Sequence, residues 1–506
     1  LDFFIDKNIE VDLVVGVSAG GCHAASYLSK QYNRAFRTNI DYLHDKEYLS
    51  FRNLIKTGSI FGMDLMFNKI PNELYPYDYE TFNKSKSKFT VVATNCETGE
   101  AEYFQLKDMK KDIMYLQASC SIPMFANIVE VDGYKLVDGG VSDSIPIEYA
   151  LKQGCNKNIV VLMGGKSSEH DVSLVSAKTV IENIDKDLYN VIMVGITKDG
   201  QWKLVDRLDH LEDGSWVNSK TSAYICPDTG RKELLLERDG KVDRISIDVV
   251  FPVLHGMNGE DGTVQGLLEL AAIPYVGCGV LASACSMDKF YTKIVVDSIG
   301  VRQAKFVGVR RHELTHMDEV VARVEAGVPY PVFVKPSKAG SSQGVSKAEN
   351  REELIDALNL AAKHDSKILV EETIVGREIE CGVLGMNEPK ASGVGEVLSA
   401  EEFYSYDAKY NNEESRTVVD PELPEGKAEE IRKDAVAIFK ALDCSGLSRV
   451  DFFLTKDTNE VVFNEINTLP GFTAISMYPM LWEARGLSKK ALVQKLIDLA
   501  MNRYDV

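Results

Sequence analysis

The chain has 506 residues, enough for three or four domains of ordinary size. Its 57 Lys and Arg residues against 76 Asp and Glu residues give a net charge of −19, which excludes an electrostatic basis for binding nucleic acid or an anionic membrane surface. No apolar run approaches the roughly 20 residues of a membrane-spanning helix, and the 9 cysteines include no C-x-x-C pair, so we expect a cytoplasmic protein with reduced thiols.

The N-terminal part predicts an α/β unit with a serine nucleophile. A short apolar strand at residues 11–15 leads into Gly-Val-Ser-Ala-Gly around Ser18, and a helix follows at 22–30. In a strand–turn–helix context, G-x-S-x-G exposes the serine hydroxyl on a tight turn. A second apolar strand ends at Asp138, in an Asp-Gly-Gly sequence. The strand–turn–helix context and the Asp-Gly-Gly sequence favour a functional Ser18, although the turn could also be retained only as an element of the fold.

A different pattern begins at residues 158–162, an apolar strand that follows the first part without a linker. Natural domain fusions usually have an exposed, flexible boundary. We therefore expect a recombined or misassembled reading frame, with this strand belonging to the second part. Residues 158–200 alternate strand, helix and strand, as in an open α/β unit, and residues 199–243 are polar and rich in turn signals.

The rest of the chain continues this alternation. A strand at 332–335 precedes a loop rich in glycine and serine, whose backbone N–H groups can close over phosphates. The remaining predicted elements are, in chain order, a strand at 245–254, helical periodicity at 287–299, a helix at 356–363, a strand at 368–372, and amphipathic helices at 425–442 and 489–502.

The stretch after residue 448 predicts a β-hairpin that gathers an arginine, two carboxylates and an amide on one face. Two apolar strands flank a turn-forming Lys-Asp-Thr-Asn sequence. Side chains alternate faces along a strand, so these four can share one surface: Arg449, Asp451, Glu465 and Asn467. Hard oxygen ligands suit Mg²⁺, which is usually held by one or two carboxylates together with substrate phosphates. A surface hairpin with solvated charges is the alternative.

Seven separated motifs in this part resemble the D-alanine–D-alanine ligase family of the ATP-grasp superfamily. In order they are MGGKSSEHDVS, HGMNGEDGTVQG, SMDK, VKPSKAGSSQGVSK, EETIVGREIE, YSYDAKY, and the pair RVDFF and NEINTLPGFT. The resemblance covers about residues 158–506. It implies ATP-dependent, ADP-forming ligation of two D-alanines for peptidoglycan synthesis, by a homodimer. It also implies three subdomains, at 158–285, 286–375 and 376–506, with ATP between the last two.

The first part resembles the patatin-like phospholipases, which use a Ser–Asp dyad. That resemblance implies a glycine-rich oxyanion loop upstream of the point where this chain begins, so we expect residues 1–157 to be a truncated fragment. Losing one oxyanion donor typically costs about 10²–10³ in rate, and we expect the Ser18–Asp138 pair to be inactive. The fold class expected is therefore α/β: an ATP-grasp ligase of three α/β and α+β subdomains, preceded by a partial patatin-like α/β domain.

The ligase resemblance assigns the nucleotide and metal contacts. The implied phosphate-binding residues are Lys289, Lys335, Ser341 and Ser342. The implied adenine and ribose contacts are Glu371, Ile374 and Glu378. Asp451, Glu465 and Asn467 would hold two Mg²⁺ ions, with Mn²⁺ as a substitute. Either lysine alone could instead be a solvated surface side chain, and Glu371 an ordinary carboxylate at a strand end.

The resemblance also assigns the amino-acid contacts. Glu169 would bind the ammonium of the first D-alanine, with His255 near the same site. Arg449 and the N–H of Gly471 would stabilise the oxyanion, and Glu169, Ser341 and Tyr410 would form a hydrogen-bonded set that closes a lid. Ser476 and Met477 would contact the second substrate. Glu169 could also simply complement the dipole of a helix start, and His255 could be structural.

Three other functions compete with this one. Related ligases make D-Ala–D-Ser or D-Ala–D-lactate; Tyr410 and Met477 favour D-alanine, although an apolar pocket rejects one added hydroxyl by only about 10²-fold. Lipid acyl hydrolysis through Ser18 and Asp138 is a second alternative. A non-catalytic ATP-binding scaffold is disfavoured, because no predicted metal or phosphate position is substituted.

Overall fold

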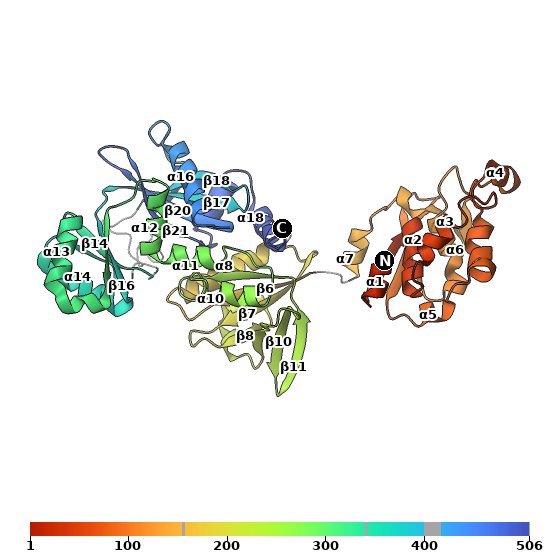
Figure 1. Cartoon of the computed structure of the whole chain (residues 1–506), viewed down its shortest axis with the longest axis horizontal. Coiled ribbons are helices and arrows are strands. Elements are labelled where there is room, and N and C mark those ends of the chain that lie inside the picture. The colour runs from red at the N-terminus through yellow and green to blue at the C-terminus, as the bar shows by residue number, and fades with distance from the viewer. Residues whose placement is uncertain (154–156, 339, 341–342, 399–415, 505–506) are drawn as a thin grey trace. The chain divides into compact units, whose positions relative to one another are not determined.

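The computed structural model describes residues 1–153, 157–338, 340, 343–398 and 416–504. The chain divides into two compact units, residues 1–155 and 156–506 (Figure 1). Each unit contains sheets covered by helices, so the predicted α/β class is confirmed. None of the helices in the described parts of the chain has the length and apolarity that crossing a membrane requires.

The first unit is built on a five-stranded sheet with the order β1-β2-β5-β4, in which β3 also pairs with β2. Only β1 and β2 run parallel. The strands are β1 (Leu13–Val17), β2 (Lys88–Asn95), β3 (Ala101–Leu106), β4 (Val129–Val131) and β5 (Tyr134–Asp138). The helices are α1 (Asp2–Asp6), α2 (Ala19–Leu28), α3 (Arg34–Ile40), α4 (Phe51–Thr57), η1 (Leu65–Leu74), α5 (Tyr79–Asn83), α6 (Met109–Ser119), η2 (Gly139–Val141) and α7 (Ile147–Lys152).

The second unit begins with a seven-stranded sheet of order β11-β10-β9-β8-β7-β6-β12. Its strands are β6 (Lys157–Gly164), β7 (Tyr189–Ile196), β8 (Trp202–Val205), β9 (Ser222–Ile225), β10 (Glu233–Arg238), β11 (Lys241–Ser246) and β12 (Val249–Leu254). The associated helices are α8 (His170–Asn183), α9 (Leu208–Glu212), η3 (Ser215–Asn218), α10 (Thr263–Leu270) and α11 (Val280–Met287). Parallel β6 pairs with β7 and β12, so the first strand of the second pattern joins this sheet.

One prediction in this region is wrong. The single strand expected at 245–254 is two strands on opposite edges of the sheet, because the chain turns at Asp248, whose carboxylate accepts the Asn158 N–H at 2.7 Å. The polar stretch at 199–243 has bends or turns at its three turn signals, and it also contributes β8 to β10 and the first half of β11. These strands are short and half exposed, so their apolar alternation is weak.

Two further sheets complete the unit. The four-stranded sheet, of order β13-β16-β14-β15, contains β13 (Phe306–Arg310), β14 (Val332–Pro336), β15 (Ser346–Ala348) and β16 (Lys367–Glu372). The five-stranded sheet, of order β19-β18-β17-β20-β21, contains β17 (Gly376–Gly385), β18 (Lys390–Leu398), β19 (Arg416–Val419), β20 (Gly446–Thr455) and β21 (Val461–Asn467). Their helices are α12 (Lys289–Ser298), η4 (Arg311–His316), α13 (Met317–Gly327), α14 (Arg351–His364), α16 (Lys427–Ala441), α17 (Met477–Glu483) and α18 (Lys489–Met501).

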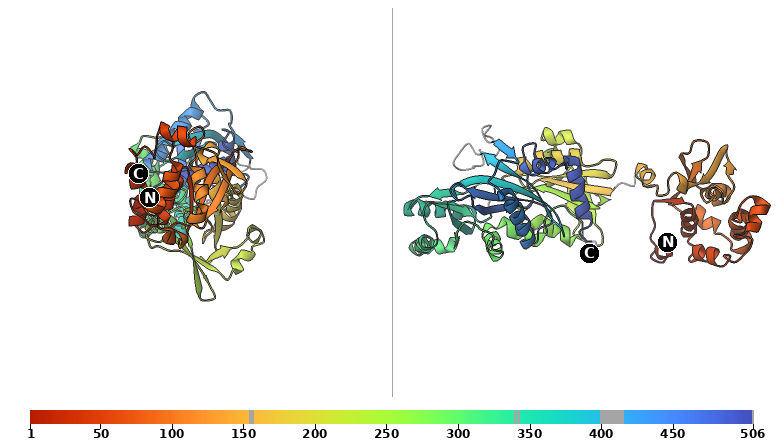
Figure 2. Two further views of the ribbon diagram at one scale, coloured as in Figure 1. Left: turned by 90° about the vertical axis from the view of Figure 1, so that its right-hand side faces the viewer. Right: turned by 90° about the horizontal axis from the view of Figure 1, so that it is seen from above.

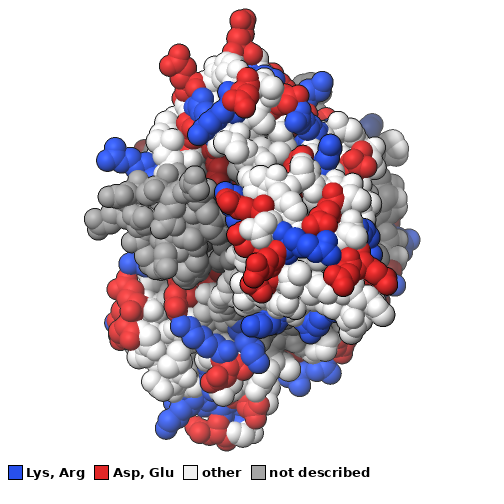
Figure 3. Space-filling view, turned by 90° about the vertical axis from the view of Figure 1, so that its left-hand side faces the viewer, with Lys and Arg blue, Asp and Glu red and all other residues white. Residues whose placement is uncertain are grey.

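Helices α13 and α14 bury their apolar faces against the four-stranded sheet, which forms one end of the second unit (Figures 1 and 2). On the surface of this end, basic and acidic side chains are interspersed (Figure 3). Some of them pair across the two helices, as Arg351 does with Asp318 at 3.1 Å and Glu325 at 2.9 Å. Exposed pairs of this kind add little stability, so burial of the apolar face holds the helices in place.

The helix expected at 287–299 is interrupted at Asp288. This residue is extended, ends α11 and caps α12 by accepting the Tyr291 N–H at 3.4 Å. Its carboxylate is buried and bonded to other elements, which outweighs the helical periodicity around it. Because of this interruption, α12 begins next to the four-stranded sheet, where the Lys289 N–H donates to the Ser337 carbonyl just after β14.

Close packing at Gly195 supports the start of α8. A Cβ on Gly195 would lie closer than 3.0 Å to the ring of Trp216, which is 2% exposed. That ring stacks on His170, with centroids 6.2 Å apart, and the His170 Nδ1 contacts the Gly165 carbonyl at 2.8 Å. The chain preceding α8 is therefore fixed through one tryptophan ring.

We predict that Gly195→Ala lowers the free energy of unfolding of the second unit by about 1–3 kcal/mol, because overpacking forces the Trp216 ring to move. The matched control is Gly266→Ala in α10, where a Cβ meets no atom within 4 Å. Alanine there is neutral or stabilises by up to about 1 kcal/mol. All three tryptophans (Trp202, Trp216 and Trp482) lie in the second unit, so their fluorescence in urea reports this transition alone. Equal midpoints for both variants would contradict the prediction.

Candidate active site

One cavity of about 400 Å³ in the second unit collects the predicted site residues. Those lining it are Glu169, His255, Lys289, Lys335, Glu371, Ile374, Glu378, Arg449, Asp451, Glu465, Asn467, Gly471, Ser476 and Met477. Ser341, Ser342 and Tyr410 lie outside the described residues. The cavity is lined by residues of the four-stranded and five-stranded sheets and by residues of α8, its N-cap and the loop after β12, so residues more than 300 positions apart in the sequence face the same space.

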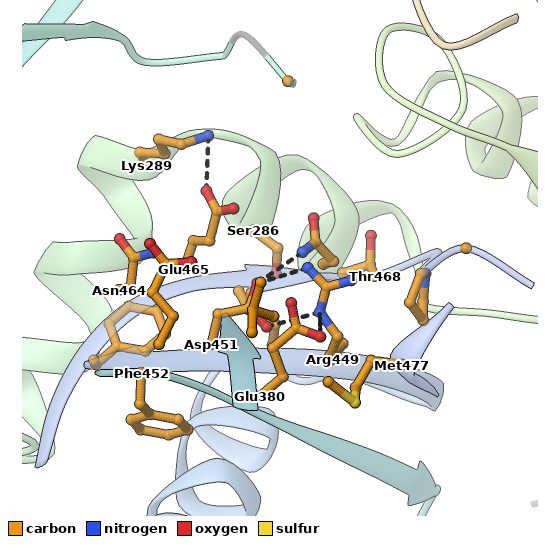
Figure 4. Close-up of a pocket in the computed structure, with 18 of the residues that line it drawn as sticks. Ser286, Lys289, Glu380, Arg449, Asp451, Phe452, Asn464, Glu465, Thr468 and Met477 are labelled. Atoms are coloured by element: carbon orange, nitrogen blue, oxygen red, sulfur yellow. Dashed lines mark hydrogen bonds and ion pairs between the residues drawn. The ribbon is translucent and has the colours of Figure 1, made fainter. Parts of the chain in front are cut away.

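The β20–β21 hairpin supplies the acidic wall of this cavity, and its predicted pairing is confirmed. Arg449 lies opposite Asn467, and Asp451 opposite Glu465, with a bulge immediately after Asp451. The Arg449 guanidinium donates to both Asp451 oxygens, from Nε at 2.8 Å and Nη2 at 2.7 Å (Figure 4). Asn467 Nδ2 donates to the same carboxylate at 3.2 Å. Arg449, Asp451 and Asn467 therefore form one bonded group, and Glu465 lies across the strand pair from Asp451.

The donor set on this wall fits a hard divalent cation. Asp451, Glu465 and Asn467 offer two carboxylates and an amide oxygen. Within the described residues, no group of three or more His, Cys, Asp or Glu side chains is placed to hold a metal by itself. Mg²⁺ typically takes one or two carboxylates and completes its octahedron with water and phosphate oxygens, which matches this incomplete protein shell. Glu465 meanwhile pairs with Lys289, at 3.4 Å.

The opposite wall carries a buried group of charges that sequence analysis found only in part. Glu371 on β16 lies between Lys335 on β14 and Lys293 on α12, with 3.2 Å between Lys293 Nζ and Glu371 Oε2. Burial opposes the charge on Glu371, but the two ammonium groups outweigh it and lower its pKa to about 2. Burial also lowers the pKa of Lys293, although Glu371 counteracts this. Lys293 is 1% exposed and was not predicted; its place on the buried face of α12, beside Val296, is the signal that could have revealed it.

A second buried ion pair connects the two predicted phosphate lysines. Asp288 accepts a hydrogen bond from Ser337 Oγ at 2.6 Å and pairs with Lys367. Burial opposes ionisation of Asp288, but Lys367 and Ser337 lower its pKa. The backbone N–H of Lys289 donates to the Ser337 carbonyl at 2.9 Å, and Ser337 follows Lys335 by two residues. The bases of both lysine side chains are therefore tied to one buried anchor.

Glu169 lies at the N-terminus of α8, as the N-cap residue. Two glycines approach its carboxylate closely: a Cβ on Gly256 would lie 2.6 Å from Glu169 Oε2, and one on Gly340 would lie 2.8 Å from it. Gly340 belongs to the glycine- and serine-rich loop after β14. The structure thus brings the Glu169 carboxylate against the loop predicted to cover the phosphates.

His255 uses both ring nitrogens within the protein. Nδ1 donates to the Leu469 carbonyl at 2.9 Å, and Nε2 lies 3.2 Å from Ser176 Oγ. Ser176 Oγ also accepts the Phe472 N–H at 3.1 Å, which leaves its proton for His255 Nε2. Burial lowers the pKa of His255, consistent with this neutral tautomer. His255 therefore joins α8 to the loop after β21, and its structural role accompanies its place in the cavity wall.

Glu260, which was not predicted, strengthens the same junction. Its carboxylate accepts the Gly256 N–H at 2.7 Å and the Leu469 N–H at 3.2 Å. Burial and the nearby Glu169 raise the pKa of Glu260 to about 8. Carboxyl groups in a cavity whose pKa values are strongly shifted are typical of functional sites. Its place in the motif that begins at His255, next to Asp261, is the sequence feature that could have identified Glu260 as a site residue.

The loop after β21 forms the remaining edge. Ser476 Oγ accepts the Thr473 N–H at 2.9 Å, and a Cβ on Gly471 would lie 2.7 Å from that oxygen. Met477 is 3% exposed and packs with Val397 and Leu481. The Met477 side chain is therefore a packed part of the wall.

In the first unit, Ser18 and Asp138 come together as predicted. Ser18 Oγ donates to Asp138 Oδ2 at 2.6 Å, and Ser18 has a φ of +52°, the strained turn between β1 and α2. The Ser18 N–H donates to Ser119 Oγ at 3.0 Å, and the Gly140 N–H donates to Asp138 Oδ1 at 2.8 Å. Few non-glycine residues adopt positive φ, and such strain is concentrated at functional positions.

Family models match both units. The description "D-ala D-ala ligase N-terminus" matches residues 158–278, and "D-ala D-ala ligase C-terminus" matches residues 295–498. "Patatin-like phospholipase" matches residues 1–151. The predicted resemblances are confirmed in both parts of the chain.

Named relatives agree with the two ligase matches. The D-alanine–D-alanine ligase of Acetivibrio thermocellus is 51% identical over 367 residues, covering 70% of this chain and 98% of that protein. That of Ruminiclostridium cellulolyticum is 52% identical over 363 residues, covering 69% and 96%. Among solved structures, the VanG D-Ala:D-Ser ligase from Enterococcus faecalis has a TM-score of 0.63 and 40% identity, covering 68% of this chain and 99% of its own. The D-alanine–D-alanine ligase from Coxiella burnetii has a TM-score of 0.61 and 35% identity, covering 69% and 95%.

We predict that Glu371→Gln lowers the free energy of unfolding of the second unit at pH 7 by about 2–3 kcal/mol, since it leaves two buried ammonium groups unbalanced. The folded pKa of Glu371 is depressed from its ordinary 4.5, so its charge stabilises the fold above pH 4.5, and this contribution is lost as the pH falls towards 2. The difference in unfolding free energy between the wild type and Glu371→Gln should therefore be constant above pH 5 and smaller by about 1 kcal/mol at pH 4.

Urea unfolding followed by tryptophan fluorescence at several pH values measures this difference. Glu352→Gln, which removes an exposed carboxylate of α14, is the control and should follow the wild type at each pH. If the difference in unfolding free energy between the wild type and Glu371→Gln is the same at pH 7 and pH 4, the charge of Glu371 is not the cause of the loss of stability.

Proposed function

The chain belongs to the D-alanine–D-alanine ligase family, and we propose that residues 158–506 join two D-alanines into D-alanyl-D-alanine, with ATP as the energy source, for peptidoglycan synthesis. One observation carries the proposal: a single cavity places the carboxylates and amide of the hairpin opposite Lys335 and Lys289. Metal-binding oxygens facing phosphate-binding ammonium groups are what phosphoryl transfer requires, because its catalysis is mainly positioning and electrostatics.

In the first step, a carboxylate oxygen of the first D-alanine attacks the γ-phosphorus of ATP, and ADP leaves. Lys289 and Lys335 contact the phosphates, while Glu371, Ile374 and Glu378 hold the nucleoside. Magnesium held by Asp451, Glu465 and Asn467 would neutralise the charge that develops on the transferred phosphoryl group. Glu169 binds the ammonium of the amino acid and so orients its carboxylate.

In the second step, the amine of the second D-alanine attacks the carbonyl carbon of the acyl phosphate. Arg449 and the Gly471 N–H stabilise the resulting oxyanion; phosphate then leaves, and the amine proton is released. Ser476 binds the carboxylate of this second substrate. Water would destroy the acyl phosphate, and the approach of Gly340 to Glu169 supports a role for that loop as a cover, with Ser341 and Tyr410 completing the closure.

The choice of second substrate follows from the apolar packing at Met477. Its side chain is buried against Val397 and Leu481, which offers no partner for a substrate hydroxyl. We therefore place D-alanine ahead of D-serine and D-lactate. The D-Ala:D-Ser ligase at 40% identity keeps D-serine as the alternative.

Several narrower features rest on the family resemblance and belong to the same proposal. They are two Mg²⁺ ions replaceable by Mn²⁺, a homodimer, a cytoplasmic location, and subdomain boundaries after residues 285 and 375.

A second function is favoured by the contact between Ser18 and Asp138 in the first unit. A serine on a positive-φ turn, bonded at 2.6 Å to a carboxylate, is the arrangement of a nucleophile with its base. We propose acyl hydrolysis as the candidate activity of this unit. The sequence-based expectation that Ser18 and Asp138 are inactive rested on a missing oxyanion loop. The contact between the two side chains does not test that expectation.

For the ligase, we predict that phosphate release from Mg·ATP requires D-alanine alone and is not increased by D-serine or D-lactate. Asn467→Ala should reduce it at least about 10²-fold, the scale on which removing one electrostatic contact acts. Asp457→Ala, in the exposed turn of the same hairpin, is the matched control and should retain activity. Phosphate release that ignores D-alanine, or survives Asn467→Ala, would refute the assignment.

For the first unit, we predict that a fluorophosphonate probe labels Ser18 in the folded full chain. Asp138→Asn should slow labelling by at least about 10²-fold, because the carboxylate no longer accepts the hydroxyl proton. Mass spectrometry of the labelled peptide identifies the serine, and Ser18→Ala should abolish the label. Equal labelling of heat-denatured protein would mean that the pair does not activate the serine.

A further inference from the structure

Arg449 lies between two carboxylates. Besides its paired contact with Asp451, its Nε is 3.2 Å from Glu380 Oε2, and the three side chains cluster at the centre of the cavity wall (Figure 4). Side-chain exposure is 18% for Arg449, 12% for Asp451 and 10% for Glu380. Interactions of charges this deeply buried are strong and poorly screened by salt.

The sheet determines this arrangement. Glu380 on β17 lies directly opposite Asp451 on β20, and Arg449 is two residues from Asp451 on the same face. Glu380 therefore reaches Arg449 along the diagonal between neighbouring strands, a distance that long side chains span. Both strands are interior to the five-stranded sheet, so the backbone positions from which the two carboxylates project are fixed on both sides.

The two carboxylates differ in what else they can do. Asp451 is a proposed metal ligand and also accepts from Asn467, so a cation bound there must replace part of its contact with Arg449. Glu380 is not among the proposed ligands. Its contact with the guanidinium is compatible with a metal on Asp451.

We propose that Glu380 is the positioning residue of Arg449: it holds the guanidinium in place when Asp451 turns to the metal, with the remaining N–H groups directed at the oxyanion. The inference rests on the proposed ligase function. It makes the second chemical step depend on Glu380 more than the first, because phosphoryl transfer relies on the lysines and the metal, whereas the tetrahedral intermediate relies on Arg449.

The test uses the full chain with Glu380→Gln, which keeps the shape and removes the charge. The control is Glu396→Gln on β18: this glutamate is equally buried and pairs with Arg377 at 2.7 Å, but it lies outside the cavity. We expect Glu380→Gln to lower kcat for dipeptide formation by about 10- to 100-fold, as misplacement of a catalytic group does, with little change in the KM for ATP. Glu396→Gln should retain the wild-type kcat.

Positional isotope exchange in γ-¹⁸O-labelled ATP with D-alanine separates the two steps. Slowing only the second step raises the ratio of exchange to net turnover, and we expect this rise with Glu380→Gln alone. A readout independent of turnover is the calorimetric affinity of the Mg·ADP complex for a phosphinate analogue of the tetrahedral intermediate, which should fall about 10-fold.

A double-mutant cycle with Arg449→Ala completes the test. Because Glu380 acts through Arg449, Glu380→Gln should have no further effect in that background. The inference is overturned if Glu380→Gln has the exchange ratio and the phosphinate affinity of the wild type, or if Glu396→Gln changes them as much as Glu380→Gln does. It is also overturned if the losses of activity caused by Glu380→Gln and Arg449→Ala add in the double mutant. A wild-type chain that makes no D-alanine-dependent product would instead refute the proposed function.

Discussion

The cavity of the second unit concentrates buried charges of both signs, and each of them has to be balanced within the protein before a nucleotide arrives. Glu371 is balanced by Lys293 and Lys335, Arg449 by Asp451 and Glu380, and Glu465 by Lys289. Burying an unpaired charge costs several kcal/mol, whereas a well-placed pair roughly compensates its desolvation. The groups that serve a substrate are thus kept charged and oriented by protein partners.

This balance explains why the site spans several elements. Lysines from α12 and β14 meet a glutamate from β16, and the Asp288–Lys367 pair holds the backbone of Lys289 against Ser337. On the other side, His255 and Glu260 fasten the loop after β21 to α8 and to the strand end of β12. The two walls are independently braced, so each can keep its geometry while side chains between them exchange partners.

Much of this could be predicted from the sequence, for reasons that differ between residues. The hairpin face of Arg449 and Asp451 follows from strand alternation alone, and the Ser18 turn follows from its strand–glycine–helix context. Lys293 and Glu380 escaped prediction, because whether a charged side chain on a helix or strand is buried is decided by distant elements. The interruption at Asp288 escaped for the same reason: its partners, Ser337 and Lys367, are 49 and 79 residues away.

The pairing of β6 also bears on the order in which the chain is made. This strand opens the second unit, yet its β12 partner lies about 90 residues further along, as the contact between Asn158 and Asp248 shows. At a synthesis rate of roughly 5–20 residues per second, one edge of β6 waits about 5–18 s on the ribosome for that partner. During this interval an apolar strand that is largely buried in the finished sheet directly follows, along the chain, a first unit that is already fully synthesised. Productive assembly of the second unit therefore depends on keeping β6 away from the open sheet edges of its predecessor.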